Sequence, residues 1–308
     1  MPEGSKRVAV IDVGTNSARM LVADVEAGRV TPVERRSTVT RLGRGVDLTG
    51  RLAAEAIEDA CAAIAGYVTT VEELGAEAVD AIATSAVRDS ENGSAFVAEL
   101  RERFALSARV LDGEEEARLT YLGATSEQPP AEPTLVVDIG GGSTELIVGT
   151  NSEISFHTSL QAGVVRHSER HVASDPPTAV ELEALAADIR SLIQAAVPPG
   201  LTASAGIAVA GTPTSLAAVE MELEPYDPAR VHGHVLPLPA IQRMLSLLAS
   251  APLAERVQIP GMHPDRAPTI VAGVVILVEV MRAFELEQIG VSEHDILYGT
   301  AIAAATRA

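Results

Sequence analysis

The same strand-turn-strand pattern occurs twice in this chain. An apolar strand runs into an acidic turn at residues 8–17, V-A-V-I-D-V-G-T-N-S, and again at residues 135–145, L-V-V-D-I-G-G-G-S-T-E. In each copy an aspartate ends the strand, glycine permits a sharp turn, and small or hydroxyl residues follow. A second apolar strand leaves each turn. The pattern therefore predicts two β-hairpins whose tips offer N–H groups to phosphate while the aspartate holds a cation.

The repetition predicts a duplicated fold with two lobes. A single glycine-rich hairpin is typical of any tight turn, but two copies about a domain's length apart indicate related lobes around a central cleft. The 308 residues suit two domains, and S-E-Q-P-P-A-E-P at 126–133 is the linker candidate. We therefore expect an N-terminal lobe at 1–126 and a C-terminal lobe at 127–308, with the closing helix 295–308 able to pack back onto the first lobe.

The apolar periodicity predicts an α/β protein. Residues 7–41 are expected to form three strands, followed by a helix at 51–75 and by alternating strands and helices up to the linker. Three more strands at 134–161 restart this order. After them only helices and one strand, A-G-I-A-V-A-G-T, are expected up to about residue 285, where a last strand, I-G-V-S-E, precedes the closing helix.

Charge and aromatic content argue against nucleic acid as a partner. The chain has 42 acidic and 23 basic residues, a net charge of −19, and only 3% aromatic residues. Such a surface repels nucleic acid and lacks the rings on which single strands stack. A polyphosphate would meet the same repulsion, but screening over about 8 Å makes the local charge decisive. Magnesium and nearby arginines would then have to supply positive charge.

Scarce residue types exclude several kinds of site. Lys6 is the only lysine, so the chain has no Walker A loop, kinase-type phosphate lysine or Schiff-base lysine. Cys61 is the only cysteine, which excludes an intrachain disulfide and a cysteine metal cage. No apolar run approaches the roughly twenty residues of a membrane helix, and M-P-E-G-S-K-R lacks a signal-peptide core. We expect a cytoplasmic protein without a membrane partner.

Three consecutive glutamates, Glu114, Glu115 and Glu116, begin a predicted helix. The helix dipole favours acidic side chains in the first turn, and this alone would account for any two of them. Because the helix begins just before the linker, one of these carboxylates could also serve as the base for an attacking water.

Two strand ends could bind phosphate. Arg88 follows a predicted strand, where it could contact phosphate or form a surface ion pair with Asp89. The turn A-G-T-P-T-S-L at 210–216 also opens a helix, and it could offer N–H groups or be an ordinary start capped by Thr212.

The histidines give weak metal signals. His167 and His171 have helical i, i+4 spacing, but the glutamate between them is misplaced for H-E-x-x-H, which argues against a ligand pair. The His294-Asp295 dipeptide is found in helical HD phosphohydrolases, yet here it follows a strand, so a helix-capping Asp295 is favoured. The glycine between His232 and His234 predicts a tight loop near a ligand or domain contact.

Seven segments together resemble the Ppx/GppA family of exopolyphosphatases and guanosine pentaphosphate phosphohydrolases. They are I-D-V-G-T-N-S-A-R-M, A-T-S-A-V-R-D, D-G-E-E-E-A-R-L-T-Y-L-G-A, V-V-D-I-G-G-G-S-T-E-L, V-H-G-H-V-L, H-P-D-R-A-P-T-I-V-A-G and V-S-E-H-D-I-L-Y-G. The resemblance spans almost the whole chain in the correct order. It implies an actin-like α/β fold of the sugar kinase and heat-shock ATPase type, ribonuclease H-like, with two duplicated domains and an interdomain cleft.

The resemblance also implies roles for individual residues. It assigns catalysis to Glu116, as the base, and to Arg88. It assigns magnesium, or manganese in its place, to Asp12, Asp138 and Glu145. The residues that match phosphate contacts are Gly14, Thr15, Asn16, Ser17, Gly141, Gly142, Ser143 and Thr144. Tyr298 departs from the pattern, because a small or acidic residue is expected before the glycine of the closing motif, and this puts local packing in doubt.

The expected activity is magnesium-dependent hydrolysis of a terminal phosphoanhydride, in polyphosphate or in the guanosine pentaphosphate of the stringent response. The family resemblance suggests a homodimer. Longer family members carry further helical domains that are associated with holding long polymer, so we expect a preference for short chains. A small-molecule kinase of the same superfold and a weakly active nucleotide- or polyphosphate-sensing module are the alternatives.

Overall fold

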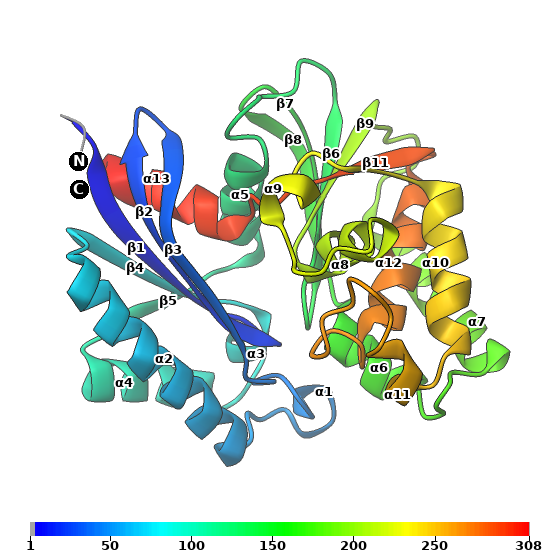
Figure 1. The fold of residues 1–308 in the computed structure, drawn as a ribbon, viewed down its shortest axis with the longest axis horizontal. Coiled ribbons are helices and arrows are strands. Elements are labelled where there is room, and N and C mark those ends of the chain that lie inside the picture. Colours follow the sequence, from blue (N-terminus) through cyan, green and yellow to red (C-terminus); the bar gives the residue numbers. More distant parts are fainter. Residues whose placement is uncertain (1–3, 308) are drawn as a thin grey trace. The chain divides into compact units, whose positions relative to one another are not determined.

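The structure is a computed structural model that describes residues 4–307 (Figure 1). Its contacts divide the chain into two units. The first unit runs to Gln128 and includes the C-terminal segment from His294, and the second unit is Pro129–Glu293. The boundary lies inside the proline-containing segment 126–133. The closing helix belongs to the first unit.

The first unit is built on a five-stranded sheet in the order β3-β2-β1-β4-β5. The strands are β1 Lys6–Val13, β2 Ser17–Glu26, β3 Arg29–Val39, β4 Ala78–Ala83 and β5 Ala108–Val110. The β1–β2 and β2–β3 pairs are antiparallel, whereas β1–β4 and β4–β5 are parallel. The helices are α1 Val46–Thr49, α2 Ala54–Leu74, α3 Ser85–Arg88, α4 Gly93–Phe104, α5 Gly113–Ala124 and α13 Ile296–Arg307.

Helices cover both faces of this sheet because β1 is apolar on both sides. Ala9 and Ile11 pack in the core with α2 and α4, while the alternating Val8 and Val10 pack with α13 (Figure 1). Tyr298 lies in this second core, 5% exposed, and its ring stacks on His294 with centroids 3.9 Å apart. The tyrosine that departs from the family pattern is therefore accommodated by packing within the first unit.

The second unit is built on a six-stranded sheet in the order β10-β11-β9-β6-β7-β8. The strands are β6 Thr134–Ile139, β7 Thr144–Thr150, β8 Glu153–Leu160, β9 Ala205–Val209, β10 Val235–Pro237 and β11 Gln288–Val291. The helices are α6 Val164–His171, α7 Ala179–Ala196, α8 Gly211–Glu220, α9 Pro228–Val231, α10 Leu238–Ser250, α11 Leu253–Arg256 and α12 Ile270–Ala283. Helix α12 is apolar except for Glu279 and Arg282 near its end, and its residues Ile270–Met281 are buried within this unit.

The two sheets share one plan. Three antiparallel strands are followed by parallel strands, as β3-β2-β1-β4-β5 in the first unit and β8-β7-β6-β9-β11 in the second. The second sheet adds β10, antiparallel to β11. Only helices were expected between the strand A-G-I-A-V-A-G-T and residue 285, and this was wrong at β10. A strand of three residues is too short to show the alternation of apolar and polar side chains. In the part of the chain that the structure describes, no helix has both the length and the apolar character needed to span a membrane.

Candidate active site

The first hairpin, β1–β2, has a turn that the rest of its unit holds in place. Gly14 N–H donates to the Ser17 carbonyl at 3.1 Å, and a Cβ at Gly14 would lie 2.9 Å from that oxygen, so glycine is required there. The carbonyls of Thr15 and Asn16 accept bonds from N–H groups of residues 40–43. Because the N–H of a trans peptide points opposite to its carbonyl, the N–H groups of Asn16 and Ser17 point away from that loop. The turn can therefore present them to an anion.

Two side chains of this turn are buried polar groups without a hydrogen bond. Asn16 Nδ2 and Ser17 Oγ have no partner among the described residues, and the two residues are 8% and 6% exposed. Leaving such a donor unsatisfied costs about 1–3 kcal/mol, so each of these groups needs a water molecule or an anion as its partner, and their assignment to phosphate stays a prediction. Thr15 differs, because its hydroxyl is 2.8 Å from Ser85 Oγ and accepts a bond from Ala86 N–H at 3.2 Å. The Thr15 hydroxyl anchors the turn to α3, and its phosphate assignment stays a prediction.

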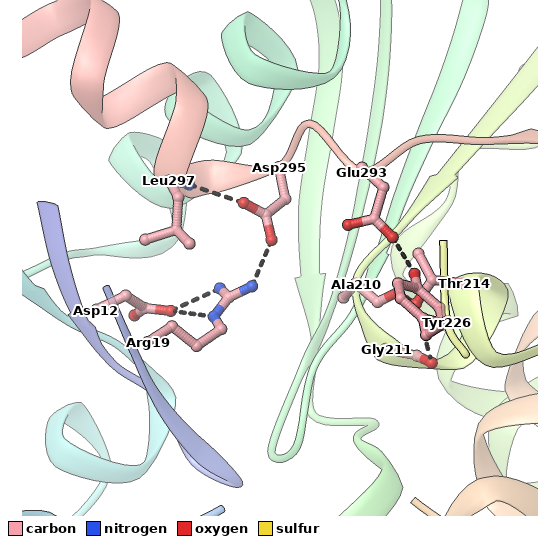
Figure 2. Close-up of polar contacts among 9 residues, drawn as sticks. All are labelled: Asp12, Arg19, Ala210, Gly211, Thr214, Tyr226, Glu293, Asp295 and Leu297. Atoms are coloured by element: carbon pink, nitrogen blue, oxygen red, sulfur yellow. Dashed lines mark hydrogen bonds and ion pairs between the residues drawn. The ribbon is translucent and has the colours of Figure 1, made fainter. Parts of the chain in front are cut away.

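Asp12 lies directly opposite Arg19 across β1 and β2. Its Oδ2 accepts bonds from Arg19 Nε at 2.9 Å and Nη2 at 2.6 Å (Figure 2). Its Oδ1 is buried and has no hydrogen-bond partner among the described residues. Burial raises the pKa of Asp12, and the ion pair with Arg19 only partly opposes this. Oδ1 is thus the oxygen that Asp12 could offer to a cation, and the metal assignment of Asp12 stays a prediction.

Arg19 is a site residue that the sequence analysis missed. Its Nη1 also contacts Asp295, whose Oδ1 accepts a bond from Leu297 N–H at 2.9 Å at the start of α13 (Figure 2). This bond confirms that Asp295 caps the closing helix. The signal that could have found Arg19 is its spacing, because it follows Asp12 by the same interval as Glu145 follows Asp138.

The three glutamates of α5 have three different environments. Glu114 is exposed, and Glu115 pairs with Arg109. Glu116 is only 6% exposed and accepts a bond from Arg88 Nη1 at 2.7 Å. Burial raises the pKa of Glu116, and Arg88 opposes this increase. A carboxylate with a raised pKa is suited to accept a proton, so Glu116 alone of the three has the environment of a general base.

Both interpretations of Arg88 correspond to contacts in the structure. Its Nε lies 3.7 Å from Asp89 Oδ1. Its Nη1 makes shorter contacts, because it donates to Glu116 Oε2 at 2.7 Å and to the Leu111 carbonyl at 2.9 Å. Arg88 therefore fixes the orientation of the Glu116 carboxylate.

The second hairpin, β6–β7, repeats the turn with different charges. Gly140 N–H donates to the Ser143 carbonyl at 3.0 Å, as Gly14 does to Ser17. Asp138 lies directly opposite Glu145, and both are buried, 8% and 2% exposed. Facing residues of an antiparallel pair have Cβ atoms about 4.5–5.5 Å apart, so both carboxylates lie on one face of the sheet. Glu145 Oε1 also accepts a bond at 2.8 Å from the Ser159 hydroxyl.

This all-oxygen set fits magnesium. Mg²⁺ and Mn²⁺ prefer carboxylate ligands, and Asp138 with Glu145 supplies two of them from a rigid hairpin. The residues would hold such an ion between β6 and β7, and their role as ligands stays a prediction.

The start of α6 shapes the glycine-rich turn of this hairpin. The carbonyls of Gly140 and Gly141 accept bonds from Val164 and Val165 N–H, and the Gly142 carbonyl accepts one from Arg166 Nε. The N–H groups of residues 141–143 consequently point away from α6 and can face an anion. A Cβ at Gly163 would lie 2.3 Å from the Gly141 carbonyl oxygen, so the helix starts directly against the turn.

Thr144 is the exception among the predicted phosphate residues of the second hairpin. Its hydroxyl donates to the Ala162 carbonyl at 2.6 Å, and the residue is fully buried. The hydroxyl stabilises the hairpin from within, so any phosphate contact of Thr144 would not involve it.

Helix α8 begins earlier than a helix start capped by Thr212 would require. The alternative that Thr212 caps this helix was wrong, because α8 begins at Gly211 and its N-cap is Ala210, with φ +72° and ψ −169°. Thr214 Oγ1 instead donates to the Ala210 carbonyl at 3.0 Å (Figure 2). A non-glycine residue with this backbone is strained, and such strain is concentrated at functional sites. Anion binding by these N–H groups stays a prediction.

The tight loop predicted around His232 and His234 is confirmed. Gly233 has φ +80° and its N–H donates to the Val291 carbonyl at 2.8 Å. His232 Nδ1 accepts a bond from Glu293 N–H at 3.2 Å, and His234 Nε2 lies 2.7 Å from Glu220 Oε2. Both imidazoles thus have partners within the second unit.

Comparison with known proteins supports the sequence resemblance. Residues 21–301 match the model of the Ppx/GppA phosphatase family. The chain is 37% identical to Exopolyphosphatase 2 of Mycobacterium tuberculosis, over 97% of this chain and 98% of that protein. The crystal structure of the Aquifex aeolicus Ppx/GppA family member superposes with a TM-score of 0.84 at 30% identity, covering 98% of each chain. An exopolyphosphatase from Cytophaga hutchinsonii superposes with a TM-score of 0.89 at 26% identity, also covering 98% of each. The predicted actin-like, duplicated α/β fold is confirmed.

Proposed function

Because the chain belongs to the Ppx/GppA phosphatase family, we propose that it is an exopolyphosphatase, which hydrolyses the terminal phosphoanhydride of inorganic polyphosphate. The observation that carries the proposal is the burial of Glu116 against Arg88, because hydrolysis needs a positioned base for water and neither neighbouring glutamate is placed in this way.

In the proposed reaction Glu116 accepts a proton from the water that attacks the terminal phosphorus. Arg88 keeps the carboxylate oriented, and a guanidinium is a group suited to a phosphate oxygen. The N–H groups of the two turns, together with the Asn16 amide and the Ser17 hydroxyl, bind the phosphate oxygens. A Mg²⁺ ion bound by Asp138 and Glu145 would neutralise part of the phosphate charge.

We further propose a preference for short polyphosphate. The net charge of −19 repels every phosphate that makes no specific contact, so added length brings repulsion without a compensating interaction. The product should therefore dissociate between cuts. Guanosine pentaphosphate has the same terminal anhydride and is a second substrate to test. The family resemblance also leads us to propose a homodimer, which sedimentation measures directly.

The test is phosphate release from short polyphosphate, long polyphosphate, guanosine pentaphosphate and ATP, each with and without magnesium. Rapid release from short polyphosphate, and a gradually shortening ladder from long polymer, are expected. ADP formation that requires an acceptor hydroxyl would indicate the kinase alternative. Tight binding of polyphosphate without release would indicate a sensing module.

A further inference from the structure

Two histidines and an aspartate meet between α6 and α7 of the second unit. His167 and His171 lie one turn apart on α6, and Asp188 faces them from α7. His171 Nε2 lies 2.8 Å from Asp188 Oδ2, and His167 Nε2 lies 3.4 Å from the same oxygen. One ligand atom from each of the three residues lies within 4.8 Å of the others. Nothing in the proposed phosphatase chemistry uses these side chains.

His167 is the informative member of this cluster. It is fully buried, and its Nε2 makes no hydrogen bond with any described residue, although Asp188 is near. Two ligands bound to one zinc ion at about 2.0–2.1 Å in tetrahedral geometry are about 3.3 Å apart. The 3.4 Å separation of His167 Nε2 and Asp188 Oδ2 therefore has the spacing of a ligand pair without the alignment of a hydrogen bond, whereas His171 Nε2 and Asp188 Oδ2, at 2.8 Å, would have to move apart when a metal binds.

We propose that His167, His171 and Asp188 form a binding site for a zinc-class divalent cation. Two imidazole nitrogens and one carboxylate oxygen prefer Zn²⁺ to Mg²⁺. Asp188 has a side chain 29% exposed, so a water molecule can occupy the fourth position. The site is distinct from the oxygen-only pair of Asp138 and Glu145.

The position of His167 is compatible with metal binding through Nε2. Burial lowers the pKa of His167 to about 4, so the ring is neutral at neutral pH, the form that binds metal. Binding through Nε2 places the ring proton on Nδ1, which now accepts a contact from Gly163 N–H at 3.4 Å. This contact is long and therefore weak, so its loss opposes binding only slightly.

Two arginines, Arg166 and Arg170, lie near enough to His167 to act on it electrostatically. Arg170 Nη1 is 3.4 Å from Asp188 Oδ2, but the Arg170 side chain is 38% exposed and can turn to solvent when a metal replaces it. The bound cation would then join α6 to α7. Because α6 begins on the carbonyls of Gly140 and Gly141, such a link would brace the turn of the second hairpin.

The test is zinc titration of metal-stripped protein in excess magnesium, against a chromogenic chelator. One equivalent of zinc should bind, raise the melting temperature, and be replaceable by Co²⁺ with the intense visible absorption of a tetrahedral site. His171→Gln and Asp188→Asn should each weaken binding at least about tenfold and abolish the thermal shift. Both side chains are partly exposed, so the variants are expected to fold.

His263→Gln is the matched control, because His263 is an exposed histidine whose Nδ1 lies 3.9 Å from Asp265. It should leave zinc affinity unchanged. Absence of stoichiometric zinc binding in the unmodified protein would overturn the proposal. Unchanged affinity in both His171→Gln and Asp188→Asn would overturn it equally, and neither outcome bears on polyphosphate hydrolysis.

Discussion

The two hairpins have the same backbone and opposite charge balance. In the first unit Asp12 faces Arg19, and in the second unit Asp138 faces Glu145, at corresponding positions of the two strand pairs. Both turns are closed by a glycine N–H bonded to a serine carbonyl, at 3.1 and 3.0 Å. The duplication has thus kept the turn and changed the residue opposite the aspartate.

This difference leads us to propose a division of the chemistry between the two units. In the first unit each buried acid of the site is bound to an arginine, Asp12 to Arg19 and Glu116 to Arg88, so these carboxylates have less need of a metal. In the second unit two acids face each other, an arrangement that a shared cation stabilises. We infer that the first unit supplies the base and the second unit binds the metal.

The strongest test of this division is Glu116→Gln. The amide keeps the shape of the side chain but cannot accept the proton of water, so phosphate release should fall on the order of a hundredfold or more. Steady-state phosphate release together with polyphosphate binding measures this, and binding should change little. Glu115→Gln is the control, because Glu115 pairs with Arg109. If only Glu115→Gln is inactive, the base is the preceding residue.

Next in size is the effect of Glu145→Gln on the metal requirement. The amide oxygen can still accept the Ser159 hydrogen bond, but one carboxylate charge is lost. The magnesium concentration for half-maximal activity should therefore rise about 10- to 100-fold. Asp12→Asn should raise this magnesium concentration less, because Arg19 already neutralises Asp12. An equal or larger increase in Asp12→Asn would contradict the division between the units.

Arg88→Ala should lower kcat/KM about tenfold or more, since a hydrogen bond between charged groups contributes about 1.5–3 kcal/mol. It should also move the acid limb of the pH–rate profile to higher pH. The acid limb moves to higher pH because burial raises the pKa of Glu116 while Arg88 opposes that increase. Without Arg88 the carboxylate therefore deprotonates at higher pH. An unchanged acid limb would show that Arg88 acts on substrate alone. Arg88→Lys should give a smaller shift.

The smallest expected effect concerns the stability of the second unit. Glu181 accepts backbone N–H bonds from Thr178, Ala173 and Ser174 at the start of α7, which lower its pKa to about 2. An acid with a lowered pKa stabilises the fold above its unfolded pKa of about 4.3, and this stabilisation is lost as the pH falls toward 2.

Glu181→Gln should consequently lower the melting temperature by a few degrees at pH 7 and by progressively less below pH 4. Thermal melts at several pH values measure this difference. Phosphate release should not change, because Glu181 contacts neither hairpin. A pH-independent difference would mean that the charge of Glu181 has no part in stabilising α7.

Local patterns explain which site features were predictable. The hairpins were predictable because aspartate, glycine and hydroxyl residues specify a strand end and a tight turn within a few positions. Glu116 was not distinguishable from its two neighbours by such patterns, since all three suit the first turn of α5. Only the resemblance to a family favoured it before the burial of its side chain was known.

The sequence by itself determined the duplication, the order of strands and helices, and the two acidic turns, because each is encoded by residues close together in the chain. Tertiary structure alone decided that Arg19 binds Asp12 and Asp295, that Arg88 holds Glu116, and that Asp188 joins His167 and His171. These contacts join residues on different strands and helices. Their charges acquire a function only when folding brings them within hydrogen-bond distance and removes the water that would screen them.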